Sequence, residues 1–120
     1  MRGKNAWEGR GNLTRDPDIK YSEGGTAIGK LSMAINESYF DKKTNTQRED
    51  VQFIDITVFG KTAEVCGQHL KKGSPLIVEG KLRFETWDDK QTGQKRSQLK
   101  VIGNDVCFLE FGGKNNQPGQ

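Results

Sequence analysis

Apolar residues are scarce in this chain of 120 residues: only 32% are hydrophobic, and the mean hydropathy is −0.82. A chain of this length forms one domain with one core. A core made from so few apolar residues must be small. This favours a small barrel over a doubly wound sheet, whose strands read as continuous apolar runs. No run approaches the length that spans a membrane, and residues 1–11 lack a signal peptide's apolar centre, so a cytoplasmic location is expected.

Histidine and cysteine are nearly absent. Cys66 and Cys107 are expected to be free and reduced, because one falls in a predicted helix, the other in a late strand, and nothing else suggests secretion. With His69 as the single histidine, neither a zinc set nor a Ser-His-acid or Cys-His grouping can be assembled. We therefore expect no enzyme activity, no metal and no cofactor. The net charge of +3, with a pI near 8.9, is a mild bias that is compatible with polyanions.

Residues 49–73 are the most informative stretch. The first half alternates with period two, with an aliphatic row (Ile54, Ile56, Val58) and a mixed row that contains two rings (Val51, Phe53, Asp55, Thr57, Phe59). After Gly60 the period becomes helical, with apolar or small residues at Ala63, Cys66, Gly67 and Leu70. The stretch therefore predicts a strand followed by a short helix that ends at Lys71, Lys72 and Gly73.

The two phenylalanines of the mixed row allow two interpretations. They can form a platform on which unpaired bases stack. Alternatively, both rings can pack beneath another sheet. The stretch alone leaves the two equally open.

A later strand, from Ser74 through Trp87, repeats this arrangement. One row is apolar (Leu76, Val78, Gly80, Leu82, Phe84), and the other carries cations before a ring (Ile77, Glu79, Lys81, Arg83, Glu85, Trp87). A tryptophan in line with a lysine and an arginine suits nucleic acid, with the ring for a base and the cations for phosphates. The alternative is that Trp87 caps the end of the barrel.

The other predicted strands and loops give the order of elements along the whole chain. We expect a first strand over residues 4–15, bent at its glycines, with Trp7 in the core or at a subunit interface. The residues from Asp16 to Asp18 break it, and a second strand runs from Thr26 towards Tyr39. Residues 41–49 and 88–94 are polar hairpin loops, and a last strand spans residues 96–111. Five strands with one helix between the third and fourth predict an all-β OB-fold, a Greek-key barrel. The domain would occupy residues 1–111, with residues 112–120 as a flexible polar tail.

Several segments together resemble the bacterial single-stranded DNA-binding proteins, over about residues 5–111. They are residues 11–18 (GNLTRDPD), Tyr21, 34–39 (AINESY), 58–64 (VFGKTAE), 70–74 (LKKGS), 78–82 (VEGKL), 87–90 (WDDK) and 93–96 (GQKR). Each is weak alone, but their shared order and spacing are specific.

The resemblance implies an OB-fold that assembles as a homotetramer. Such an assembly wraps single-stranded DNA without sequence preference, and protects and organises it in replication, recombination and repair at the nucleoid. The family's base-stacking aromatics fall on Tyr39, Phe53, Phe59 and Trp87. Its phosphate contacts fall on Lys61, Lys71, Lys72 and Arg83, and less closely on Lys42 and Lys43.

The chain also departs from the family pattern. The first strand replaces an aliphatic run with Trp7 and glycines, and Asp55 and Glu85 stand where some members carry basic residues, which should lower phosphate affinity. The chain ends at Gln120 without the acidic tip that recruits replication and repair proteins. This points either to a truncated form or to a short phage, plasmid or organelle-like form. Two other functions stay open at this point: a primosome-type OB bridging protein, and an OB-fold binder of RNA or oligosaccharide.

Overall fold

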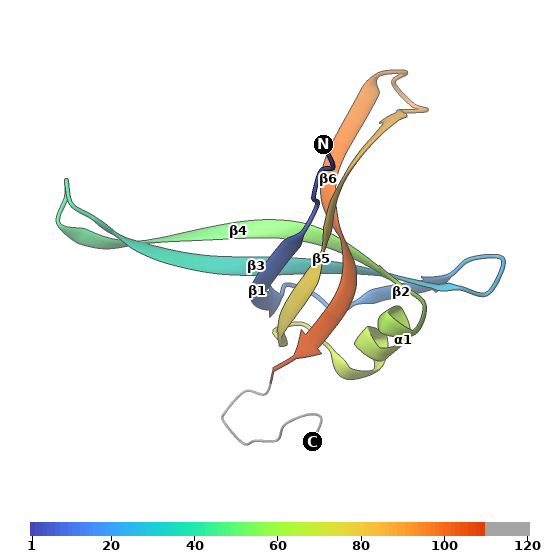
Figure 1. Ribbon diagram of the computed structural model, residues 1–120, viewed down its shortest axis with the longest axis horizontal. Coiled ribbons are helices and arrows are strands. Elements are labelled where there is room, and N and C mark those ends of the chain that lie inside the picture. Colours follow the sequence, from blue (N-terminus) through green and yellow to red (C-terminus); the bar gives the residue numbers. More distant parts are fainter. Residues whose placement is uncertain (110–120) are drawn as a thin grey trace.

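Six strands and one helix form the part of the chain that the computed structural model describes, residues 1–109 (Figure 1). The elements are β1 (Trp7–Leu13), β2 (Asp18–Tyr21), β3 (Ala27–Asp41), β4 (Thr46–Phe59), α1 (Gly60–His69), β5 (Pro75–Asp88) and β6 (Lys95–Phe108). They form one sheet in the order β1-β5-β6-β4-β3-β2, and β1 also pairs with β3. That second pairing closes a barrel, which confirms the predicted OB-fold. The predicted tail, residues 112–120, lies outside the described residues, as do residues 110 and 111.

Two glycines let backbones approach closely in the barrel, Gly11 of β1 against β3 and Gly80 of β5 against β6. Strand β1 pairs with β5 over most of its length and meets β3 at its end, where Leu13 lies opposite Met33. A Cβ at Gly11 would overlap the carbonyl oxygen of Ala34, and a Cβ at Gly80 would overlap that of Ile102. Only glycine fits at these two crossings, and the one at Gly11 is consistent with the predicted bend in the first strand.

Asn5, just before β1, is hydrogen-bonded to β5 through its side chain, and Trp7 packs at the start of the strand. Leu82 donates its N–H to Oδ1 of Asn5 and accepts a hydrogen bond from Nδ2 of Asn5, both at 2.8 Å. Trp7 is half-buried and packs against the core, and its indole covers Gly9, where a Cβ would overlap the ring. The tryptophan therefore contributes to the core, one of the two roles predicted for it.

A short strand that the sequence did not predict, β2, follows the first strand. The chain breaks at Asp16 and Pro17 as predicted, but pairing resumes at once as β2, with Ile19 opposite Gly29 of β3. The sequence analysis expected no strand between the break at residues 16–18 and the strand that begins at Thr26, and it therefore missed β2. The reason is that β2 carries one inward apolar residue and shows no alternating row of its own.

Helix α1 packs beside β2, β3 and β4, on the lower right of the barrel in Figure 1. Ala63 and Cys66 are fully buried, as their spacing predicts, whereas Gly67 is exposed. A Cβ at Gly67 would lie 2.8 Å from Cγ1 of Ile19, so glycine lets β2 pack closely against the helix. The helix ends before Leu70, whose N–H donates to the carbonyl oxygen of Cys66 at 2.9 Å.

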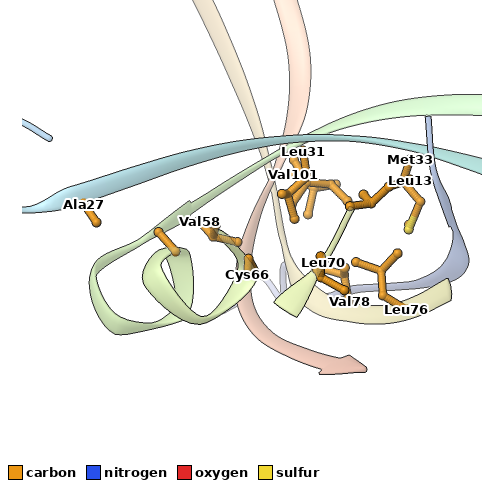
Figure 2. Close-up of a cluster of buried hydrophobic side chains, with 12 residues drawn as sticks. Leu13, Ala27, Leu31, Met33, Val58, Cys66, Leu70, Leu76, Val78 and Val101 are labelled. Atoms are coloured by element: carbon orange, nitrogen blue, oxygen red, sulfur yellow. The ribbon is translucent and has the colours of Figure 1, made fainter. Parts of the chain in front are cut away.

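The core is small, as the composition predicts (Figure 2). Twelve buried hydrophobic residues form it: Leu13, Ala27, Leu31, Met33, Ile56, Val58, Ala63, Cys66, Leu70, Leu76, Val78 and Val101. They come from the inward rows of β1, β3, β4, β5 and β6, from the buried side of α1, and from Leu70 directly after it. Two members of the predicted apolar row of β5, Leu82 and Phe84, are instead exposed. The β5–β6 hairpin leaves the barrel after a bulge between Glu79 and Gly80, so the row loses its partners.

Two long hairpins project from the barrel in different directions (Figure 1). The β3–β4 hairpin turns between Asp41 and Thr46, and the β5–β6 hairpin turns between Asp88 and Lys95. The polar loops predicted at residues 41–49 and 88–94 are their tips, although β4 already begins within the first of them. At the second tip, hydrogen bonds from the backbone of Gln91 and the side chain of Arg96 lower the pKa of the Asp89 carboxyl.

Candidate nucleic-acid interface

The side of β4 that faces away from the core carries both phenylalanines of the mixed row. Ile56 and Val58 are buried on the inner side, whereas Phe53 is 69% exposed and Phe59 is 46% exposed on the outer side. Within residues 1–109, no sheet covers either ring. The interpretation that both rings pack beneath another sheet is therefore wrong within this chain.

Strand β6 connects this side of β4 to the cationic row of β5. It runs parallel to β4, with Thr57 beside Ile102, and antiparallel to β5, with Arg83 opposite Lys100 and Trp87 opposite Arg96. Residues that lie side by side in a sheet project to the same face. Phe53, Phe59 and Trp87 therefore share one surface, which we call the outer face. Its defining residues are Lys30, Phe53, Asp55, Thr57, Phe59, Arg83, Glu85, Trp87, Arg96, Gln98 and Lys100.

Trp87 lies on the projecting part of the β5–β6 hairpin and is 46% exposed. It does not cap the barrel, so that alternative is wrong. The flat ring stays accessible beside Arg96, its cross-strand neighbour. A ring next to a guanidinium is an arrangement that suits a stacked base and its phosphate.

The two unusual acids lie in the middle of the outer face. Glu85 pairs with Lys100 at 3.1 Å and with Arg83 at 3.5 Å. Asp55 accepts a hydrogen bond from Nε2 of Gln98 at 2.9 Å. Glu85 thus neutralises the arginine that the resemblance assigns to phosphate, together with a lysine from the neighbouring strand.

Tyr39 is not brought together with the other three aromatics. It is exposed and lies opposite Arg48. Along β3 it falls in the same row as the inward residues Leu31 and Met33. This register puts it on the opposite side of the β3–β4 hairpin from Phe53. The next residue, Phe40, is also exposed and lies on the side of Phe53. The sequence prediction missed Phe40, although its parity could have revealed it.

The lysines assigned by resemblance lie away from the outer face. Lys61 is in the first turn of α1, and Lys71 and Lys72 are in the loop that follows it. That loop is fixed by hydrogen bonds from the N–H of Lys72 to Oδ1 of Asp16 at 2.8 Å and from the N–H of Lys71 to Oγ of Ser74 at 3.0 Å. Lys42 and Lys43 occupy the turn of the β3–β4 hairpin.

Sequence reasoning missed Lys30, Arg96 and Lys100 on the outer face and Arg15 beside it. Arg15, Lys30 and Lys100 line one cavity together with Asp55, Thr57 and Gln98. Lys30 lies opposite Thr57, and Lys100 reaches the same place from β6. Alternation puts Lys30 outside the apolar row of its strand, but only the pairing of β4 with β6 reveals that these residues meet.

Both cysteines are free, and burial raises the pKa of the Cys66 thiol to about 11, whereas Cys107 is exposed. Among residues 1–109, no group of three or more histidine, cysteine or acidic side chains is arranged to hold a metal ion. The described part of the chain also contains no helix that is long and apolar enough to cross a membrane.

A closed barrel of this topology, with aromatic rings and cations exposed on one side of the sheet, defines an OB-fold binding protein. The single-strand binding protein family matches residues 10–109. The chain belongs to this family, which confirms the resemblance found in the sequence.

Individual relatives agree with this assignment. The single-stranded DNA-binding protein of Wolinella succinogenes is 43% identical over 103 residues, which is 86% of this chain and 62% of that protein. That of Helicobacter hepaticus is 41% identical over 100 residues, which is 83% of this chain and 58% of that protein. The matched region therefore spans about three-fifths of the length of these curated relatives.

Solved structures share the fold. The SSB of Plasmodium falciparum, in complex with ssDNA, superposes with a TM-score of 0.84 at 25% identity, over 92% of this chain and 98% of that one. A deletion mutant of the single-stranded DNA binding protein from Thermus aquaticus gives a TM-score of 0.82 at 33% identity, over 93% of this chain and 53% of that one.

Proposed function

We propose that this chain binds single-stranded DNA on the outer face and does so without requiring a particular sequence. The observation that supports this most is the exposure of three aromatic rings, Phe53, Phe59 and Trp87, on one continuous side of the sheet. Bases of a single strand can stack on such rings, whereas a duplex keeps its bases paired and inaccessible. Phe40 extends this aromatic surface along the β3–β4 hairpin, and Tyr39 offers a further exposed ring on the opposite side of that hairpin.

The phosphates of the bound strand would contact the lysine and arginine side chains. Arg83, Arg96, Lys30 and Lys100 lie on the outer face itself. We propose that Lys42, Lys43, Lys61, Lys71 and Lys72 continue the track beyond the sheet for a longer strand. Because each neutralised phosphate releases a counterion, binding would weaken with salt by about 0.7 log units per contact and per tenfold change in salt.

The biological role that fits this binding is protection and organisation of single-stranded DNA during replication, recombination and repair in the cytoplasm. The chain would act by binding alone, without catalysis or a cofactor. We also propose that four copies assemble as a homotetramer with dihedral symmetry, because Leu82, Phe84 and Leu99 are exposed on the side of the β5–β6 hairpin opposite the outer face, and such apolar surface is usually shared with a partner.

A fluorescence titration tests the proposal. Trp7 is half-buried and Trp87 is exposed, so the variant Trp7→Phe would isolate the signal of the outer face. We expect quenching by oligo(dT) with a defined stoichiometry, and much weaker binding of duplex DNA. Tighter binding of RNA or of oligosaccharides than of oligo(dT) would replace this function with the alternative OB-fold one. A primosome-type bridging role would instead require a second protein to bind at the same time.

Assembly needs a separate measurement. Light scattering on the free protein would give a tetramer, and long oligo(dT) would bind far more tightly than short oligo(dT) because it touches several subunits. A monomer at micromolar concentration, with no gain from a longer strand, would contradict the tetramer and leave a single binding domain.

A further inference from the structure

A cavity of about 250 Å³ lies in the outer face, at the part of β4 between Phe53 and Phe59 and beside Gln98 and Lys100 of β6. Its polar lining combines both signs of charge, with side chains from β3, β4, β6 and the segment that follows β1. These residues are Arg15, Lys30, Asp55, Thr57, Gln98 and Lys100. The cavity therefore offers hydrogen-bond donors and acceptors at one place, which a simple phosphate track does not need.

Asp55 is the unusual member of this lining. Its Oδ2 accepts a hydrogen bond from Nε2 of Gln98 at 2.9 Å. No lysine or arginine among the described residues forms an ion pair with it, whereas Glu85 on the same face has two such partners. The second carboxylate oxygen of Asp55 and the amide oxygen of Gln98 both remain available as acceptors.

A carboxylate at this position repels phosphate, because like charges at contact distance disfavour each other. A DNA strand that crosses the outer face is therefore oriented with a base, and not a phosphate, next to Asp55. The strand geometry allows this contact. Asp55 is two residues from Phe53 on the same side of β4, about 7 Å along the strand, and a base stacked on that ring can extend its edge this far.

The donors and acceptors in the cavity match one base best. Guanine carries adjacent donors, N1–H and the 2-amino group, which a carboxylate can accept together. It also carries the O6 acceptor, which a lysine or arginine contacts. Thymine has no amino group, and cytosine and adenine each offer a single amino group without an adjacent ring N–H. Lys30 lies diagonally across from Asp55 on β3 and can supply the donor to O6, whereas Lys100, beside Asp55 on β6, is paired with Glu85.

We infer that this cavity is a base-reading subsite that takes guanine, with Asp55 as the acceptor for its N1–H and 2-amino group. The inference rests on the proposed function, since a strand must first bind to the outer face. It adds one preferred base to a surface whose stacking and phosphate contacts are indifferent to sequence.

The experiment compares oligonucleotides of equal length at fixed salt. The first contains only thymine, the second contains isolated guanines separated by thymines, so that quadruplexes do not form, and the third carries inosine at those positions. We expect the guanine oligonucleotide to bind about five-fold or more tightly than the thymine one, the low end of what a bidentate contact to a base edge contributes. Inosine lacks the 2-amino group and should retain only part of this gain.

The variant Asp55→Asn should abolish the guanine preference and tighten binding of the thymine oligonucleotide, because it removes a negative charge. Asp50→Asn is the matched control. It removes the same charge from the same strand. However, Asp50, which pairs with Glu37, projects from the face of the hairpin opposite to that of Asp55. This variant should keep the preference of the unmodified protein.

The outcomes separate the two proposals. If no single-stranded oligonucleotide binds, the proposed function fails. If thymine and guanine oligonucleotides bind equally well, the function stands and the subsite is wrong. A preference that survives Asp55→Asn, or one for a matched cytosine oligonucleotide over guanine, would also overturn the assignment of this subsite to guanine.

Discussion

The two sides of β4 show how one strand serves two purposes. On the inner side, Ile56 and Val58 are buried in the barrel core. On the outer side, Phe53 and Phe59 are exposed next to an acid. The rings are as apolar as the aliphatic residues, yet they contribute nothing to the core of this chain. Apolar character alone therefore does not locate the core, and strand parity combined with pairing does.

This comparison predicts that stability and binding can be separated within one strand. The largest effect is expected on the inner side. Ile56→Ala removes buried methylene groups and leaves a cavity, so it should lower the free energy of unfolding by about 2–5 kcal/mol. Urea denaturation measures this. Affinity for oligo(dT) per folded molecule should stay the same, and Phe59→Ala, the matched change on the outer side, should leave the unfolding midpoint nearly unchanged.

The outer side should give the opposite pattern. Trp87→Ala removes one stacking ring, so it should weaken oligo(dT) binding by about 1–3 kcal/mol while the melting temperature changes little. Binding can be followed by fluorescence anisotropy of a labelled oligonucleotide, since the variant loses its own signal. A fall in stability with unchanged affinity would instead make Trp87 a structural residue.

Within the outer face, Glu85 is expected to weaken DNA binding, because it competes with phosphate for Arg83 and Lys100. Glu85→Gln frees both cations, so oligo(dT) should bind up to about five-fold more tightly at low salt, the scale of a partly exposed ion pair. Asp88→Asn is the control, because Asp88 pairs with Lys95 on the other side of the same hairpin. A gain of equal size in both variants would reflect net charge and not release of the two cations.

The smallest expected effects are single phosphate contacts. With a short oligonucleotide, Lys30→Ala and Arg83→Ala should each flatten the dependence of log affinity on log salt by about 0.7. Lys71→Ala should change the slope only with long strands, because its loop lies away from the outer face. An affinity for short oligonucleotides that is insensitive to salt would argue against an electrostatic contact altogether.

Much of the fold followed from local patterns. Alternation correctly separated Phe53 and Phe59 from the inner row of β4, and the helical spacing after Gly60 located α1. Local patterns did not predict features that depend on pairing with segments distant in the sequence. Strand β2 exists because β3 offers it an edge, and Phe84 is exposed because its hairpin extends beyond the barrel.

The candidate site was predictable only in part, for the same reason. Trp87 and Arg83 share one strand, so the sequence could connect them. The cavity at Asp55 joins segments distant in sequence through the parallel pairing of β4 and β6, which no local pattern encodes. Tyr39 was grouped with the other rings by resemblance, but the register of β3 with β4 puts it on the opposite side. Parity was the better guide there.

The side chain of Asn5 covers the backbone of β5 at the point where its pairing with β1 ends. Its amide carries one donor and one acceptor in the same arrangement as a peptide group, and it occupies both the N–H and the carbonyl oxygen of Leu82. A backbone edge left open at this position would be a template for a strand from another chain. Asn5 imitates the next peptide of β1 without being part of the strand. It thereby ends the ladder and leaves neither backbone group of Leu82 free to pair with such a strand.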